Sequence, residues 1–251
     1  MIDHRRIDTP KISRRLAVLG FHKIGPPPPG QSSTWFYISE SIFEGVLGWL
    51  QKSSWQVIDA ETFLRGLDLP NSLPERAVLL TFDDGYRSMR HIALPLLRSF
   101  GFPSVLFVPV SYIGATNSFD ADVEPEEPIC DWDDLEELQG GKVSIQSHGV
   151  THRRLSTLDD VELRYEIEHS KIAIESRIGH AVKLFSFPYG DNGREPRVTT
   201  AILREAGYSA AFLYGGKLNV TPANDRFGLQ RLAMGPDTDL AVSLLRSLQS
   251  S

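Results

Sequence analysis

The chain has 251 residues, of which 41% are apolar, so it is long enough for one domain with a well-buried core. Its formal net charge of −6 argues against nucleic acid as a partner, because proteins that bind nucleic acid concentrate Lys and Arg. The single cysteine, Cys130, excludes an internal disulfide, and no stretch approaches the roughly 20 apolar residues of a membrane span.

The whole chain, 1–251, is predicted to form a single domain, with residues 1–12 as a flexible N-terminal extension. The apolar run 16–21 comes next and predicts the first strand. This run is too short for the apolar segment of a signal peptide, and no cleavage-like site follows it. We therefore expect a cytoplasmic protein; the alternative is a protein whose leader has been trimmed.

Short apolar runs alternate with helical patterns along the chain. The predicted strands cover residues 16–21, 77–82, 104–110, 142–146, 184–187, 210–214 and 229–234. The predicted helices cover residues 39–52, 88–100, 131–139, 157–179, 197–206 and 239–248, with caps at Ser39, Thr157 and Gly179. Such alternation is typical of an α/β fold with a parallel sheet, and seven or eight units in this length favour a β/α barrel over an open sheet.

Two segments between the predicted elements are irregular. Residues 25–34 are rich in Pro and Gly, and residues 114–128 (GATNSFDADVEPEEP) are acidic. We interpret both as solvated surface loops; the alternative is that they rim a pocket.

Two motifs that can bind a metal follow predicted strands. Asp83 and Asp84 come directly after the strand 77–82, where two adjacent carboxylates are costly unless a positive group faces them. His148 and His152 follow the strand 142–146, and their spacing of four puts both rings on one face if the segment forms a helical turn. In a β/α barrel the carboxyl ends of strands share one face, where the chemistry lies.

Two imidazoles and one carboxylate make three ligands with an open position, which is typical of a catalytic metal site. Zinc is the divalent metal we expect, and Co, Ni or Fe also suits such a ligand set. The open position takes a water, whose pKa the metal lowers, and the spare carboxylate can accept its proton.

A third motif, residues 185–191 (FSFPYGD), also follows a predicted strand. Pro188 and Gly190 favour an unusual turn that can direct a backbone N–H toward a developing oxyanion. The alternative is a tight turn with a packed Tyr189.

Together, TFDDGY (81–86), SHGVTH (147–152) and FSFPYG (185–190) resemble the motifs of the polysaccharide deacetylases, the NodB-homology enzymes of carbohydrate esterase family 4. GFHKIG (20–25) and the helix beginning at Asp131 look similar to the poly-N-acetylglucosamine deacetylase branch. The resemblance implies a distorted (β/α) barrel with about seven strands. It implies a substrate with N-acetylated glucosamine units, from which acetate is released.

The resemblance also implies roles for individual residues. Asp83 would be the general base, and the Tyr189 backbone N–H would be an oxyanion donor. The metal ligands would be Asp84, His148 and His152.

Two family features are missing from the sequence. Many members carry an Arg shortly before the third motif's Pro, where this chain has Phe-Ser-Phe, and a late Leu-x-His whose histidine protonates the leaving amine. Arg231 lies where the late motif would be, but arginine, with a pKa above ~12, is a poor acid. We therefore expect His22 to be the leaving-group acid or an orienting partner of Asp83; the alternative is a packing histidine. The expected substrate contacts are Trp132, Phe187, Pro188 and Arg231.

Two other functions stay open. The superfamily that the motifs resemble includes hydrolases of cyclic imides, ureides and formamides, so one alternative keeps the metal site and changes the substrate. The missing family residues also allow a carbohydrate-binding protein without catalysis.

Overall fold

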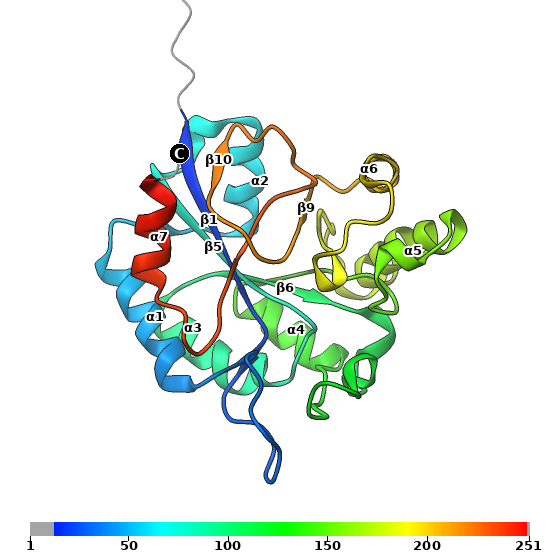
Figure 1. Ribbon diagram of the computed structural model, residues 1–251, viewed down its shortest axis with the longest axis horizontal. Coiled ribbons are helices and arrows are strands. Elements are labelled where there is room, and N and C mark those ends of the chain that lie inside the picture. The colour runs from blue at the N-terminus through cyan, green and yellow to red at the C-terminus, as the bar shows by residue number, and fades with distance from the viewer. Residues whose placement is uncertain (1–12, 250–251) are drawn as a thin grey trace, which may run out of the picture.

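A computed structural model describes residues 13–249, so the predicted extension 1–12 lies outside the described residues. One curled sheet forms the centre, and the helices lie around it (Figure 1). Its strands occur in the order β10-β1-β5-β6-β7-β8-β9. The bounds are Arg14–Phe21 for β1, Arg76–Phe82 for β5, Ser104–Val108 for β6, Val143–Ser147 for β7, Leu184–Ser186 for β8, Ala210–Phe212 for β9 and Asn219–Thr221 for β10.

The strands from β1 through β9 run parallel, and short pairings draw the two edges of the sheet together. Phe212 of β9 bridges to Leu229, and the next strand, β11 (Leu232–Ala233), pairs with β1. β4 (Gln56–Val57) adds to β5, and a separate two-stranded sheet joins β2 (Lys23–Ile24) to β3 (Tyr37–Ile38). The predicted α/β fold with a distorted barrel of about seven strands is confirmed.

Seven α-helices occur within residues 13–249. They are α1 Glu40–Lys52, α2 Ala60–Asp68, α3 Leu94–Phe100, α4 Trp132–Gly140, α5 Asp160–Ile178, α6 Pro196–Glu205 and α7 Leu240–Gln249. No helix in the described part of the chain is both long and apolar enough to cross a membrane.

Alternate strand residues pack into two hydrophobic clusters on opposite faces of the sheet. One cluster joins residues such as Leu19 and Leu80 to the surrounding helices, and the other joins Val18 and Leu79 to Phe63 of α2. Burial on both faces explains why these parallel strands are continuous apolar runs.

Several predicted boundaries were wrong. α5 begins after Asp159, whose carboxylate accepts from the Val161 and Glu162 N–H groups in a capping box, so Thr157 is not the cap. The predicted helix 88–100 starts as a π-helix over Met89–Ala93, because Pro95 has no N–H for a regular α-helical ladder. α2 was not predicted, although Asp59 caps it and its apolar residues have helical spacing.

Candidate metal centre

Polar residues collect where β5, β7 and β8 end, as predicted. Asp83 and Asp84 follow β5, His148 follows β7, and Tyr189 follows β8 by three residues. Because the carboxyl ends of neighbouring parallel strands meet at one edge of the sheet, these residues share one pocket.

Asp84, His148 and His152 are all buried, and their ligand atoms lie within 4.8 Å of one another. Asp84 Oδ1 is 3.3 Å from His148 Nε2 and 3.1 Å from His152 Nε2, yet it makes no hydrogen bond within residues 13–249. His148 Nδ1 lies 2.7 Å from the Ser186 carbonyl oxygen, which can only accept, so Nδ1 carries a proton and the lone pair of the neutral imidazole is on Nε2, toward Asp84. Three electron-pair donors facing one point fit a divalent cation.

The segment from His148 to His152 is a loop, so the predicted helical turn was wrong. Gly149 and His152 have left-handed backbones, with φ of 81° and 54°, and Asp84 has a φ of 69°. This conformation is uncommon for residues other than glycine, and it occurs where surrounding contacts impose it at functional sites. The two imidazoles therefore converge through a bent loop.

A buried carboxylate on α5, Glu166, holds this loop. Its Oε2 accepts from Val150 N at 2.6 Å and Thr151 N at 2.9 Å, and its Oε1 accepts from the Thr151 hydroxyl. A Cβ atom at Gly149 would lie 2.9 Å from Oε2, so only glycine fits there without a shift. Glu166 was not identified from the sequence, because nothing local marks it as the partner of this loop.

Asp83 is paired with Arg231, which was expected from the sequence to contact substrate. Arg231 is fully buried, and it donates to Asp83 Oδ1 from Nη1 at 2.7 Å and to Oδ2 from Nη2 at 2.6 Å. Its remaining donors bond Ser186 Oγ, Thr81 Oγ1 and the Leu213 carbonyl. All five donors are used inside the protein, so Arg231 orients Asp83 and does not reach a substrate.

The pKa values of this cluster follow from burial and neighbouring charge. Burial would raise the pKa of Asp83, but Arg231 and His148 lower it. Burial would also raise the pKa of Asp84, but His152 and His148 lower it well below its usual range. For His148 the burial effect is outweighed by Asp83 and Asp84, and its pKa is raised. Both carboxylates are therefore ionised at neutral pH.

The turn after β8 has the unusual conformation predicted for it. Tyr189 has a φ of 57°, and its N–H has no hydrogen-bond acceptor among the described residues. The Tyr189 hydroxyl donates to Asp120 Oδ1 at 2.7 Å, and its ring contacts His152 edge-on. Phe119 also contacts the His152 ring, with centroids 4.1 Å apart.

His22 lies in the same pocket. Its Nε2 is 4.0 Å from Asp83 Oδ2, its ring packs against Phe36 and Tyr214, and its buried Nδ1 has no partner in the described part of the chain. Burial lowers the pKa of His22, and Asp84 and Asp83 oppose this only in part. His22 was expected to be either the leaving-group acid or the orienting partner of Asp83. Because Arg231 orients Asp83, the leaving-group acid is the role that stays a prediction for His22.

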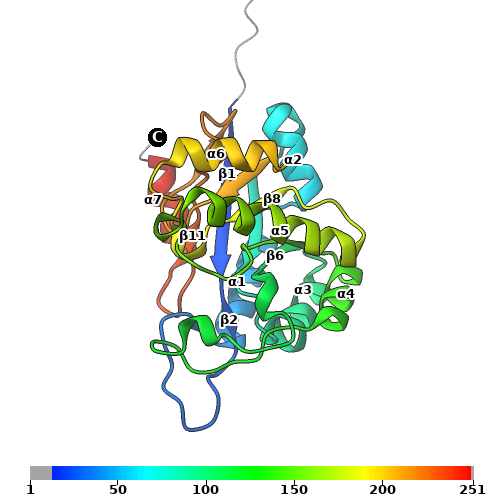
Figure 2. The ribbon, with the colours of Figure 1, turned by 90° about the vertical axis from the view of Figure 1, so that its right-hand side faces the viewer.

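The acidic segment 114–128 is not simply solvated, contrary to the favoured interpretation, whereas residues 26–34 are exposed or half-buried as expected. Glu124 of the acidic segment accepts from Lys23 Nζ at 2.5 Å and from Thr34 Oγ1 at 2.8 Å. The Lys23 ammonium is buried between the Tyr37 and Tyr86 rings. The two segments lie side by side at one end of the molecule (Figure 2), and the acidic one reaches the pocket.

The pocket has a volume of about 260 Å³. Phe187, although nearly fully buried, lines it as expected, and it also packs on Phe185. Trp132 does not line it, because its ring is partly buried against the larger hydrophobic cluster, 6.0 Å from the Arg177 guanidinium of α5. Pro188, also expected to contact substrate, does not line the pocket. It is buried beside the ligand loop, where a Cβ atom at Gly149 would lie 3.9 Å from its Cγ. The residues that line the pocket and were not predicted to do so are Phe36, Tyr86, Asp120, Val123, Glu124, Arg154 and Tyr214.

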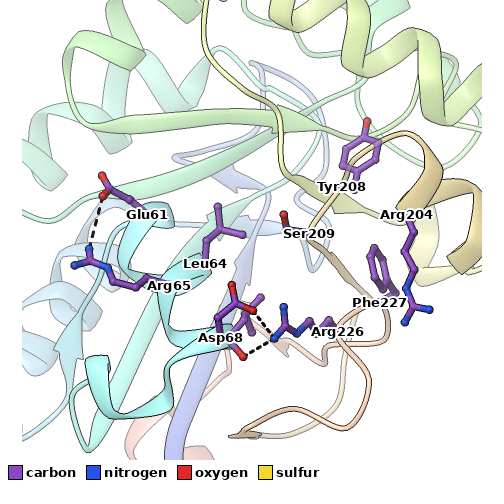
Figure 3. Close-up of a pocket in the computed structure, with 10 residues that line it drawn as sticks. Glu61, Leu64, Arg65, Asp68, Arg204, Tyr208, Ser209, Arg226 and Phe227 are labelled. Atoms are coloured by element: carbon purple, nitrogen blue, oxygen red, sulfur yellow. Dashed lines mark hydrogen bonds and ion pairs between the residues drawn. The ribbon is translucent and has the colours of Figure 1, made fainter.

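A larger cleft of about 780 Å³ lies beside α2 and the start of β9. Figure 3 shows Arg226 turned toward Asp68, with which it forms an ion pair at 2.7 Å. Arg65 and Glu61 form a second pair, at 3.8 Å, and both are exposed. This cleft contains none of the predicted site residues.

Comparison with known proteins identifies relatives across most of the chain. Over 194 residues it is 24% identical to YxkH of Bacillus subtilis, covering 77% of this chain and 62% of that protein. Over 214 residues it is 20% identical to a poly-beta-1,6-N-acetyl-D-glucosamine N-deacetylase of Staphylococcus aureus, covering 80% and 69% respectively. The chain thus spans about two thirds of the length of these relatives.

Solved structures share the fold. The Streptococcus pyogenes deacetylase PplD, in complex with acetate, superimposes with a TM-score of 0.79 at 18% identity, over 94% of this chain and 99% of that one. IcaB from Ammonifex degensii gives a TM-score of 0.75 at 23% identity, over 89% and 93%. Residues 71–211, more than half of the chain, match the family model for polysaccharide deacetylase. The chain therefore belongs to the polysaccharide deacetylase family.

Proposed function

We propose that the protein hydrolyses the acetamide of N-acetylated amino sugars of the glucosamine type and releases acetate. Asp84, His148 and His152 would hold a divalent metal ion, and zinc is the ion that we propose. One observation carries the proposal: the three ligand atoms lie within 4.8 Å of one another beside a second carboxylate, Asp83. The substrate class is supported by the Staphylococcus aureus relative, whose name describes it as an N-deacetylase of poly-N-acetylglucosamine.

When bound, the metal supplies an acidified water and polarises the acetamide carbonyl. Asp83 can accept a proton from the attacking water, because Arg231 and His148 lower its pKa against the effect of burial and so keep the carboxylate ionised at neutral pH. The bidentate pair with Arg231 fixes the carboxylate plane, so the free lone pairs of Asp83 face the pocket.

The Tyr189 N–H stabilises the developing oxyanion. It has no acceptor within residues 13–249, and the left-handed backbone fixes its direction before substrate binds. Asp120 holds the Tyr189 side chain by its hydroxyl, which limits movement of the turn.

The leaving amine takes back the proton that Asp83 accepted, through His22. The two side chains are 4.0 Å apart, and burial lowers the pKa of His22. His22 is therefore neutral at rest and serves as a relay during turnover.

The test is acetate release from N-acetylglucosamine oligomers by metal-loaded and chelator-treated protein. We expect release that chelation abolishes and added metal restores. Turnover of cyclic imides or formamides alone would favour another C–N hydrolase. Oligosaccharide binding by a protein that retains no metal would favour a carbohydrate-binding role without catalysis.

A further inference from the structure

Arg154 lies at the mouth of the pocket and is positioned by an aromatic ring. Its guanidinium carbon is 4.5 Å from the centroid of the Tyr189 ring, and Tyr189 is 40% exposed. Arg154 follows the metal-ligand candidate His152 by two residues and lines the same pocket. Its charge is therefore next to the turn whose N–H faces the acetamide in the proposed function.

The guanidinium of Arg154 makes no ion pair or hydrogen bond within the described part of the chain. Its neighbour Arg153 differs, because it pairs with Glu162 at 2.9 Å. Asp191 interacts with the charge of Arg154, but its two carboxylate oxygens accept from Ser156 and from the Gly193 N–H and do not bond the guanidinium. The in-plane donors of Arg154 are free.

The acidic groups of the pocket do not bond the Arg154 guanidinium either. Asp120 accepts from the Tyr189 hydroxyl, and Glu124 is paired with Lys23. Asp83 is paired with Arg231, and Asp84 is one of the three metal-ligand candidates. A positive group at the mouth of the pocket is thus left for an incoming ligand.

A guanidinium stacked on a ring keeps its edge free, and that edge matches the planar oxygens of a carboxylate or phosphate. We infer that Arg154 binds an anionic group on the substrate, so that the preferred substrate is an N-acetylated sugar with a carboxylate or phosphate near the scissile acetamide. The inference rests on the proposed deacetylase function and narrows its substrate class. A carboxylate on the sugar ring and the phosphate of an activated precursor offer the same chemistry.

The experiment compares kcat/KM for acetate release from three substrates with wild-type protein and the variants R154Q, R154K and R153Q. The substrates are a neutral N-acetylglucosamine oligomer, an oligomer with N-acetylmuramic acid, and N-acetylglucosamine 1-phosphate. The second carries a carboxylate and the third a phosphate, so they separate the two sources of the anion. We expect wild-type protein to prefer one anionic substrate at least about 10-fold over the neutral one.

The variants test whether Arg154 causes that preference. R154Q is expected to remove it, R154K to restore part of it, and R153Q to keep it. Equal turnover of all three substrates by wild-type protein, or an undiminished preference in R154Q, would overturn the inference.

Equilibrium binding of the same sugars separates this inference from the proposed function. Tighter binding of an anionic sugar that depends on Arg154, without acetate release from any substrate, would support the inference about Arg154 and refute deacetylation. Turnover of every substrate without a charge preference would do the reverse.

Discussion

Two hollows of the molecule differ in size and in the state of their charges. The cleft near α2 is about 780 Å³, and its ion pairs, such as Arg226–Asp68, are open to water. The pocket at the strand ends is about 260 Å³, and the charges of Asp83, Asp84 and Arg231 are buried. The candidate site is therefore the smaller hollow with buried charges and not the larger cleft. Charges interact more strongly where little water surrounds them, and such groups are typical of functional sites.

The largest predicted effect is the loss of a metal ligand. Asp84→Asn is expected to lower acetate release by about 10³-fold or more and to remove bound metal. Asp68→Asn, which breaks the exposed pair in the larger cleft, should leave both unchanged. Activity and metal content are measured for both variants side by side. An equal fall in the two variants would contradict the assignment of the site to the pocket at the strand ends.

Arg231→Gln is predicted to destabilise the protein strongly, because it leaves the Asp83 carboxylate buried without its partner. We expect the free energy of unfolding to fall by about 3–5 kcal/mol, against about 1 kcal/mol or less for Arg226→Gln. Chemical denaturation of both variants measures this difference, and similar losses would refute it.

The pH dependence provides a second test of the same pair, with Arg231→Lys as the milder variant. Arg231 lowers the pKa of Asp83 by favouring its ionised form, so a weaker partner raises that pKa. Asp83 then stays protonated up to a higher pH, and the acidic limb of the kcat/KM profile should move upward. An unmoved acidic limb would mean that Asp83 is not the base.

His22→Ala is predicted to lower kcat by about 10²-fold with a smaller change in KM, since general acid–base groups contribute about that much. His22→Gln keeps much of the side-chain shape but cannot pass a proton to the leaving amine, so its kcat should be equally low. Steady-state kinetics across pH measure this, and unchanged turnover would reduce His22 to a packing residue against Phe36 and Tyr214.

Glu166→Gln is predicted to weaken metal binding by about 10- to 100-fold, because a buried partner of the ligand loop is altered. Excess metal should restore most of the activity, which a merely unstable protein would not show. Glu168→Gln changes a neighbouring carboxylate of α5 that pairs with Arg164 at the surface, and it is the matched control. Equal metal affinities in a chelator competition assay would contradict the role of Glu166.

The positions of the site residues could be predicted because local patterns mark them. Apolar runs identify the strands, and the parallel arrangement brings their ends together. The convergence of His148 and His152 was expected for the wrong reason, since left-handed backbones and the distant Glu166 bend that loop.

The partner of Asp83 could not be predicted, because Arg231 is 148 residues away in the chain. Only the curled sheet, which brings the segment before β11 beside β1 and β5, places the guanidinium there. The same holds for Lys23 and Glu124, 101 residues apart, whose contact attaches the acidic segment to the pocket.

The most direct test is a titration of metal-free protein with Zn²⁺ while acetate release from an N-acetylglucosamine oligomer is measured. Activity should rise linearly and saturate at one equivalent, and His148→Ala should bind no metal tightly and stay inactive. Full activity without metal, or an active metal-loaded His148→Ala, would contradict a catalytic metal held by Asp84, His148 and His152.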